Sequence, residues 1–350
     1  MKELFIKNFD HDLIFWYKKN GRDLPWRHTK NPYFIWISEI MLQQTQVDTV
    51  IDYYRRFIER FPTVNDLAAA GEDEVFKLWE GLGYYRRASN LMAAAKTISE
   101  KYDGCFPADY DTILSLKGIG NYTASAVASI AFDIPKGVVD GNTLRIISRI
   151  YNRQDNIAKD KTKKEYQVVM DALIDRDHPS DFNQAMMDLG AMICTPKNPK
   201  CSCCPVSAYC EAHECHTEHI LPVNIKPRTK NETELITAVI KYGDRYLMIK
   251  NREGLLKNLY GLIQYEVQSP AAFEDTFYEN YGISVRLTAY GKLVRHVFTH
   301  RVWLMQGYLG VISENPEKII AAHPEINLYT ANELEKIAIS TAHQKVMRLF

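Results

Sequence analysis

A dense cysteine segment constrains this chain more than any other feature of its sequence. Six of the seven cysteines lie between Cys194 and Cys215. The disulfides of a secreted scaffold would be spread along the chain, so this clustering indicates a metal site in a reducing compartment. The spacing Cys194-x6-Cys201-x2-Cys204-x5-Cys210 can bring four thiolates around one compact centre.

Two kinds of centre use four thiolates. Zinc sites more often join two CxxC-like pairs separated by a hairpin or helix, whereas one tight loop better fits a [4Fe–4S] cluster. Four buried cysteines without any metal fit this density poorly. Cys203 and Cys215 are additional thiols, and Cys203 adjoins Cys204, so spacing alone does not fix the ligands. We expect Cys105 to be an ordinary buried thiol.

The length and composition fit two globular domains. The chain has 350 residues, 46% of them hydrophobic and 25% charged, enough for two cores. The charges of its 43 basic and 43 acidic residues cancel, so the formal net charge is zero at pH 7. This balance excludes a histone-like cationic chain but not a nucleic-acid partner, because only the contacting face must be positive. We find no signal peptide and no membrane-spanning run, and we expect a cytoplasmic protein.

The residue pattern changes from helical to strand-like after the cysteine segment. Residues 1 to about 190 are predicted to be helical, because Ala-rich amphipathic stretches alternate with Pro, Gly and Asp. Residues 221–228 contain two prolines and are predicted to be a linker. The following strands and helices predict an α+β domain. The strands are expected at 235–242, 245–250, 285–290 and 302–311, and the helices at 331–337 and 342–349.

Two local sequence patterns are typical of segments that contact phosphates. Gly118 and Gly120 lie in a Gly-x-Gly hairpin between two predicted helices, and the free N–H groups of the second helix suit a phosphate oxygen. A hairpin without a ligand is an equally good interpretation. Arg145, Arg149 and Arg153 recur every four residues and predict a stripe that contacts phosphates or is simply solvated.

Two carboxylates stand in unusual local sequences. Glu39 interrupts an apolar run, and such surroundings raise a carboxyl pKa, so that the group can stay protonated as a general acid must. A structural hydrogen-bond network is the alternative. Asp140 follows two apolar residues and precedes a turn, which predicts a carboxylate held at the mouth of a helix. A plain helix N-cap explains it equally well.

Six motifs occur in the order found in one family. They are Arg22-Asp23-Leu24-Pro25-Trp26-Arg27, Ser38-Glu39-x-Met41-Leu42-Gln43-Gln44-Thr45, Gly81-Leu82-Gly83-Tyr84-Tyr85, the Gly118-x-Gly120 hairpin, Val139-Asp140-Gly141-Asn142 and the four-cysteine loop. Over residues 1 to about 215 the chain resembles the adenine DNA glycosylases (MutY) of the helix-hairpin-helix superfamily, which includes endonuclease III. The remainder resembles, more weakly, that family's MutT-like (Nudix-fold) domain.

The resemblance implies a multidomain repair enzyme. It implies an all-α, two-lobed glycosylase domain with a [4Fe–4S] loop at 1–215, a linker at 216–228, and an α+β domain at 229–350 that recognises 8-oxoguanine. The expected partner is double-stranded DNA carrying A:8-oxoG or A:G mispairs. A monomer in the bacterial cytoplasm, working at the nucleoid and not at a membrane, would flip out the adenine and remove it hydrolytically. The implied cluster ligands are Cys194, Cys201, Cys204 and Cys210.

The resemblance also assigns catalytic roles. Glu39 matches the general acid that protonates adenine at N7, and Asp140 the carboxylate that stabilises the oxocarbenium-like sugar or captures it covalently. Tyr122 lies where the lyase relatives carry a Schiff-base lysine. Because a tyrosine cannot form that imine, we expect base removal without strand cleavage, with a trace from Lys117 at most. Tyr122 and Asn142 match positions that orient water and the carboxylates.

Other matches concern the substrate. Adenine must leave the base stack to reach the acids, and Gln44 and Tyr84 match residues that wedge into the duplex. Trp26, Arg27 and Gln184 match positions near the adenine pocket, although core packing also explains Trp26 and Gln184.

The last domain matches a reader of the opposite base. Residues Phe298-Thr299-His300 match a recognition loop that usually reads Phe-Ser-His, and Thr keeps the hydroxyl. The Nudix hydrolase signature is absent from the sequence, so we expect a reader and not a pyrophosphatase. Residues 260–265 depart from the family's Gly-Leu-Trp-Glu-Phe-Pro, a change that bears on local packing and not on base removal.

Two other functions compete with adenine removal. The first is a pyrimidine-damage or thymine-mismatch glycosylase of the same superfamily, against which the Gln43-Gln44 pair and the Phe298-Thr299-His300 loop argue. The second is a non-catalytic DNA-binding protein with a redox-sensing cluster. Intact Glu39 and Asp140 argue against it, since a binder has no use for two carboxylates facing an anionic backbone.

Overall fold

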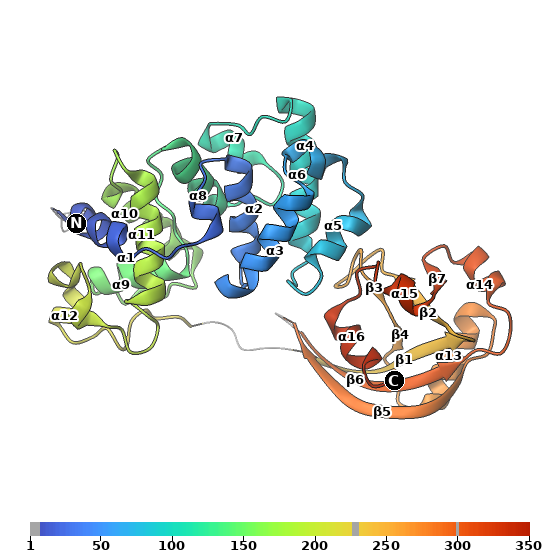
Figure 1. Cartoon of the computed structure of the whole chain (residues 1–350). Helices are drawn as coiled ribbons and strands as arrows, with labels where there is room; N and C mark the ends of the chain where they lie inside the picture. Colours follow the sequence, from blue (N-terminus) through green and yellow to red (C-terminus); the bar gives the residue numbers. More distant parts are fainter. Residues whose placement is uncertain (1–7, 226–230, 299–300) are drawn as a thin grey trace. The chain divides into compact units, whose positions relative to one another are not determined.

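The structure of the chain is a computed structural model that describes residues 8–225, 231–298 and 301–350. Contacts divide the chain into two compact units (Figure 1). The first comprises Met1–Ala69 and Ser89–Pro227, and the second comprises Ala70–Ala88 and Arg228–Phe350. None of the helices in the described ranges is long and apolar enough to cross a bilayer.

The first unit is built of helices, which confirms the prediction for residues 1 to about 190. Its elements are α1 (Phe9–Asn20), η1 (Pro25–Arg27), α2 (Pro32–Leu42), α3 (Val47–Arg60), α4 (Val64–Ala69), α6 (Arg86–Tyr102), α7 (Tyr110–Ser115), α8 (Asn121–Phe132), α9 (Gly141–Ile150), α10 (Asp160–Leu173), α11 (Pro179–Met192), η2 (Cys201–Cys203), η3 (Ser207–Tyr209) and α12 (Glu211–Glu214).

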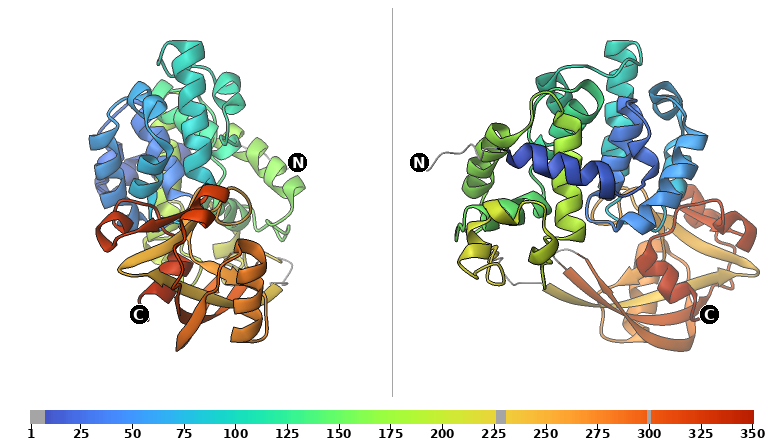
Figure 2. Two further views of the ribbon diagram at one scale, coloured as in Figure 1. Left: turned by 90° about the vertical axis from the view of Figure 1, so that its right-hand side faces the viewer. Right: turned by 60° about the vertical axis from the view of Figure 1, so that its left-hand side comes forward.

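Helix α8 is the centre of this unit because its side chains are small. Ala124, Ser125, Ala126 and Ala128 are fully buried, and their size lets α2 and α11 approach the α8 backbone closely. Helix α11 packs in turn against α1 and α9, and the right-hand view of Figure 2 shows α1 (blue) crossing α11 (yellow-green). This packing holds the N-termini of α8 and α9, where two predicted site residues lie, at defined positions.

The second unit is a mixed sheet with helices on its two faces, as the α+β prediction required. Strands β1 and β6 pair in parallel, the other pairs are antiparallel, and the order is β3-β2-β1-β6-β5, with β4 paired to β1 and β7 to β2. The elements are β1 (Asn231–Tyr242), β2 (Arg245–Lys250), β3 (Tyr260–Gly261), β4 (Ile263–Tyr265), α13 (Pro270–Tyr281), β5 (Arg286–Val297), β6 (Arg301–Val311), α14 (Glu317–Ala322), β7 (Ile326–Tyr329), α15 (Ala331–Leu334) and α16 (Thr341–Met347).

Alternating residues of β1 face different helices. Ile236, Ala238 and Ile240 pack with Phe273 and Phe277 of α13 in one core, whereas α16 covers the opposite face. The predicted hairpin between β1 and β2 is present, and Gly243 provides its positive φ of 60°. Long strands β5 and β6 form the curved side of the sheet, with β5 at its edge (Figure 1).

A segment from the helical part of the sequence belongs to this second unit. It contains α5 (Glu72–Trp79), and Asp73 pairs with Lys250 at 2.5 Å. Glu80 accepts hydrogen bonds from the backbone N–H of Ile339 and from Gln344 Nε2, both at 2.8 Å. In the first unit, Ile157 N–H donates to the carbonyl of Val223 at 2.9 Å. Part of the segment predicted to be a linker is therefore bound to the helices.

Candidate functional site

The two predicted catalytic acids are brought to one place by α2, α8 and α9. Glu39 lies on α2 with only 4% of its surface exposed. The hydroxyl of Tyr122, in the first turn of α8, donates to Glu39 Oε2 at 2.5 Å. The pKa of Glu39 is raised to about 7, chiefly by burial and to a smaller extent by the nearby Asp140 carboxylate, while the Tyr122 hydrogen bond and the charge of Arg27 act in the opposite direction. A carboxyl with this pKa can carry a proton near neutrality.

Asp140 is held at the N-terminus of α9 by a capping box. Its Oδ1 accepts from the backbone N–H of Thr143 at 2.7 Å, and Thr143 Oγ1 accepts from the backbone N–H of Asp140 at 2.7 Å. Asn142 Nδ2 donates to the other oxygen at 3.0 Å. Asp140 also lines an open cleft of about 470 Å³, together with Tyr122 and Gln167. Asp140 is therefore a helix N-cap whose side chain also lines a cleft.

A second cavity gathers the residues expected near adenine. Trp26, Arg27, Gln184 and Glu39 all line it. Trp26 is buried and packs edge-on against Tyr54, with ring centroids 5.4 Å apart. The structure thus places all three predicted pocket residues beside the predicted general acid.

A buried aspartate that sequence reasoning missed organises this cavity. Asp188 of α11 has a fully buried carboxylate, which accepts from Arg27 at 2.6 and 2.7 Å and from Arg22 Nε at 2.8 Å. The charge of Arg27 is therefore neutralised inside the protein. An acidic residue on the buried face of an apolar helix is the sequence signal that could have revealed the ion pair.

The two hairpin glycines have different surroundings. Gly118 has a φ of +79°, and a Cβ added there would collide with Asn90 of α6. Gly120 is the N-cap of α8 with a φ of −103°, and it has open space beside it. Gly118 is required by packing and backbone conformation, whereas Gly120 leaves the helix N-terminus accessible.

Both predicted wedge residues have left-handed backbone at exposed positions. Gln44 has a φ of 59° and Tyr84 a φ of 49°, and 47% of the Tyr84 surface is exposed. For a residue with a side chain this conformation costs about 1–2 kcal/mol, and such strain concentrates at functional sites. The Arg87 guanidinium lies 5.4 Å from the Tyr84 ring centroid.

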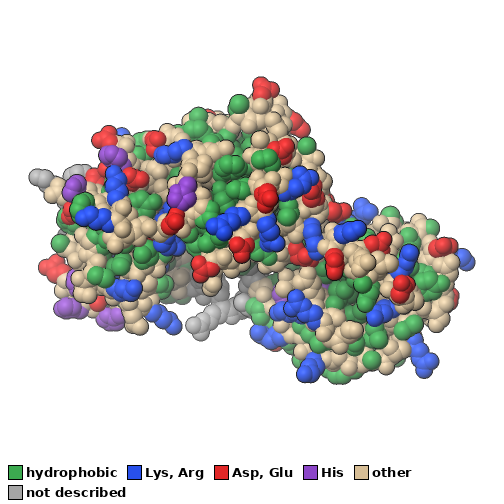
Figure 3. All heavy atoms as spheres, in the orientation of Figure 1, with side chains coloured by type: hydrophobic (Ala, Val, Ile, Leu, Met, Phe, Trp, Pro, Cys, Tyr) green, Lys and Arg blue, Asp and Glu red, His purple; other side chains and the backbone are tan. Residues whose placement is uncertain are grey.

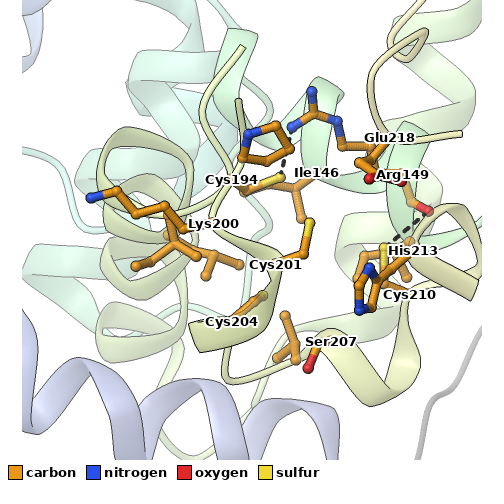
Figure 4. Close-up of a pocket in the computed structure, with 15 residues that line it drawn as sticks. Ile146, Arg149, Cys194, Lys200, Cys201, Cys204, Ser207, Cys210, His213 and Glu218 are labelled. Carbon is orange, nitrogen blue, oxygen red and sulfur yellow. Dashed lines mark hydrogen bonds between the residues drawn. The ribbon is translucent and has the colours of Figure 1, made fainter. Parts of the chain in front are cut away.

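Four cysteines line one cavity (Figure 4). They are Cys194, Cys201, Cys204 and Cys210, the set that the spacing suggested. Cys203 and Cys215 are exposed. Burial raises the pKa of the Cys204 thiol to about 12 and that of Cys210 to about 11. Four sulfur donors around one cavity, with the extra thiols outside it, fit a four-thiolate centre.

Two predictions made from the sequence, one for Cys105 and one for the arginine stripe, are wrong. Cys105 is exposed and not buried, because it follows the C-terminus of α6 in a loop. The arginine stripe is neither a phosphate contact nor a solvated face, since Arg145 is 6% exposed and Arg149 1%. Arg153 pairs with Asp155 and Glu165, at 2.7 Å each.

The two buried arginines instead hold the cysteine loop. Arg149 Nη1 donates to Cys194 Sγ at 3.2 Å. Arg145 Nε donates to the Cys194 carbonyl at 2.7 Å, and its Nη2 donates to Asn142 Oδ1 at 3.0 Å. Because Asn142 also donates to Asp140, hydrogen bonds connect the cysteine loop to a predicted catalytic carboxylate.

In the second unit, Phe298 lies in an aromatic group. Its ring is 4.8 Å from that of Trp303 and 4.6 Å from that of His296. The other two residues of the predicted recognition loop, Thr299 and His300, lie outside the described residues. His343 was not anticipated by sequence reasoning. It is buried, it accepts from the backbone N–H of Leu262 at 3.0 Å, and burial lowers its pKa to about 3.

Comparison with known proteins agrees with this geometry. Residues 37–171 match the family described as HhH-GPD superfamily base excision DNA repair protein, and residues 236–349 match the NUDIX domain. A solved structure of a thermostable thymine-DNA glycosylase aligns with a TM-score of 0.54 at 30% identity, covering 60% of this chain and 96% of that one. The fold and these matches place the chain in the class of base-excision DNA repair proteins with a Nudix-like second domain.

Curated relatives narrow the class to one family. The adenine DNA glycosylase of Buchnera aphidicola subsp. Baizongia pistaciae is 38% identical over 263 residues, covering 73% of this chain and 74% of the relative. The adenine DNA glycosylase of Rattus norvegicus is 44% identical over 218 residues, covering 60% of this chain but only 42% of the rat protein. The chain belongs to the adenine DNA glycosylase family, as its motifs indicated.

Proposed function

We propose that this protein removes adenine paired with 8-oxoguanine or guanine from double-stranded DNA, hydrolysing the N-glycosidic bond and leaving an abasic site. The observation that carries the proposal is the grouping of Glu39, Tyr122 and Asp140. One carboxyl is buried with a pKa of about 7, and the other is bound by hydrogen-bond donors at a helix N-terminus. Glycoside hydrolysis uses two carboxyl groups in unlike environments.

Each group has a distinct part in the proposed reaction. Protonated Glu39 donates its proton to adenine N7, so that the base leaves as a neutral molecule. Ionised Asp140 stabilises the positive charge on the sugar or captures the sugar covalently. Tyr122 orients Glu39 through its hydroxyl, and because it carries no amine it forms no imine with the opened sugar. Base removal without strand cleavage follows.

The cavity beside Glu39 is the proposed adenine site. Trp26 provides an aromatic wall there, and the Gln184 amide can contact a polar edge of the base. Exposed Gln44 and Tyr84 are the proposed wedge into the duplex. Phe298, with Thr299 and His300, is the proposed reader of the opposite base.

We also propose a [4Fe–4S] cluster held by Cys194, Cys201, Cys204 and Cys210. When bound, such a cluster braces its loop and can exchange single electrons. Arg149 holds Cys194 in place with its hydrogen bond to Sγ. The proposed domain limits are 1–215, 216–228 and 229–350, in a monomer that works in the cytoplasm.

DNA contact in this proposal comes from local features. Basic and acidic side chains are interspersed on the face shown in Figure 3, in agreement with the zero net charge. The amides at Gly120 and the wedge residues remain as contacts, whereas the buried Arg145 and Arg149 do not. Affinity for undamaged DNA should therefore be moderate.

Base release from defined duplexes tests the function. Duplexes carrying adenine opposite 8-oxoguanine, thymine opposite guanine, or an oxidised pyrimidine are incubated with the protein, and any free base is identified. Free adenine from the first duplex alone is the expected result. Thymine release would instead favour a thymine-mismatch glycosylase, to which the similarity with the thymine-DNA glycosylase structure points. Strand breaks without alkali would contradict the role given to Tyr122.

Asp140→Asn tests the second carboxyl. Asparagine caps a helix as well as aspartate, so the variant should keep its stability and DNA binding but lose base release. Asp109 is a matched control, because it caps α7 by accepting from the backbone N–H of Thr112 at 3.0 Å. Asp109→Asn should leave base release unchanged. Near-normal release by Asp140→Asn would remove Asp140 from the mechanism.

A further inference from the structure

Two polar side chains share the cysteine cavity with the four sulfur atoms. His213 lies in α12 and Glu218 follows it, and both line the cavity (Figure 4). A ring nitrogen of His213, a carboxylate oxygen of Glu218 and Cys201 Sγ all lie within 4.8 Å of one another. An imidazole and a carboxylate are therefore close enough to act on a group held by Cys201.

Each of these side chains has a buried polar atom that lacks a hydrogen bond. His213 Nδ1 and Glu218 Oε2 are both inaccessible to solvent and have no partner in the described part of the chain. Buried polar groups in proteins are nearly always paired, so unpaired atoms facing a cavity indicate a partner that belongs in it. Cys201 Sγ, or a group that it holds, is an acceptor near this ring, and Glu218 Oε2 is itself without a hydrogen bond in the described part of the chain.

The two side chains have opposite effects on a metal–sulfur centre. An N–H directed at sulfur withdraws electron density and stabilises the more reduced, more negative state. A carboxylate at similar distance repels the added electron and stabilises the more oxidised state. The four cysteines provide the ligands, so neither His213 nor Glu218 is needed to complete the set.

We infer that His213 and Glu218 set the reduction potential and the retention of the cluster bound in this cavity, His213 by donating a hydrogen bond to sulfur and Glu218 by opposing it with its charge. The inference rests on the proposed [4Fe–4S] cofactor. The potential concerns the exchange of a single electron, which the bound cluster would take from an external one-electron donor and give up to an external one-electron acceptor. His213 and Glu218 are positioning residues, since they act on the cluster through hydrogen bonding and charge.

The test uses the full-length protein with its cluster. Iron and sulfide analysis of the wild type comes first, followed by the potential of the cluster at an electrode and the rate at which a chelator removes iron. His213→Leu removes the donor, and His213→Asn keeps an N–H near the position of Nδ1. Glu218→Gln removes the charge at nearly constant volume. The exposed neighbours Glu214 and His216 provide matched controls as Glu214→Gln and His216→Leu.

The expected shifts differ in sign. His213→Leu should lower the potential and speed iron loss about tenfold, the usual effect of removing an outer-shell partner. His213→Asn should stay near the wild type, Glu218→Gln should raise the potential, and the controls should not move it. Shifts of the same sign for His213→Leu and Glu218→Gln, or no shift, would overturn the inference, because mere loosening of the loop has no opposing sign.

The wild type separates the possible failures. Adenine release by a wild-type protein without iron would preserve the proposed function and overturn both the cofactor and this inference. A normal iron content with unaltered variants would overturn this inference alone.

Discussion

Replacing Glu39 by glutamine should stabilise the protein at alkaline pH while abolishing base release. Glutamine has nearly the same shape and can still accept the hydrogen bond from Tyr122, but it carries no proton for the leaving base. The stability gain arises because wild-type folding buries a carboxyl that is ionised at high pH. Such a gain at the expense of activity is typical of functional residues.

The magnitude follows from the pKa of Glu39. Burial is the main cause that raises it from 4.5 to about 7. A folded-state pKa above the unfolded value means that the associated stability is complete below pH 4.5 and is lost as the pH rises through about 7. The full difference corresponds to about 3 kcal/mol. Glu39→Gln should therefore exceed the wild type by about 3 kcal/mol above neutrality and match it in acid.

Urea unfolding at about pH 4 and about pH 8.5 measures this difference. The exposed Glu59 provides a control, and Glu59→Gln should follow the wild type at both pH values. If the wild type and Glu39→Gln lose the same stability between the two pH values, Glu39 does not ionise in a buried site. The assignment of a raised pKa, and with it the general acid, would then be wrong.

Further substitutions test other parts of the site. Gly118→Ala should destabilise the protein by at least about 1–2 kcal/mol in urea unfolding, because its positive φ and the side chain behind it exclude a Cβ. Gly120→Ala should cost less, because it loses only the N-cap preference of α8, and equal losses would refute this distinction. Asp188→Asn leaves two arginines without their carboxylate and should cost about 3–5 kcal/mol, so a neutral effect on thermal unfolding would show that the pair contributes little. Tyr122→Phe removes a hydrogen bond that lowers the pKa of Glu39, so the alkaline limb of base release against pH should move upward, and a downward move would contradict the geometry.

Local sequence was sufficient for several parts of the site. The apolar run around Glu39 predicted burial, and burial is the main cause of its raised pKa. The spacing of Cys194 to Cys210 suggested a four-thiolate set that lines one cavity. A two-residue turn between alternating strands predicted the hairpin at Gly243. In each case the physical cause lies within a few residues along the chain.

The arginines show where local reasoning fails. Their four-residue spacing placed Arg145 and Arg149 on one face of a helix, but periodicity cannot tell whether that face meets solvent or protein. The partner of Arg149 is Cys194 Sγ, 45 residues away, and that of Arg27 is Asp188, 161 residues away. The charge of Arg27 is neutralised by a distant carboxylate, and the buried guanidinium of Arg149 is satisfied by distant sulfur and carbonyl acceptors.

The sequence by itself determined the two-part architecture, because helical and strand-like residue patterns differ along the chain. Through its resemblance to a known family it also pointed to the cysteine set and the two acids that we propose. Only the tertiary structure decided that Glu39, Tyr122 and Asp140 meet, although Glu39 and Tyr122 are 83 positions apart. It also decided that His213 and Glu218 face the cysteines. Close packing of small α8 side chains against α2 and α11 places the acids, and no local pattern specifies which helices approach one another.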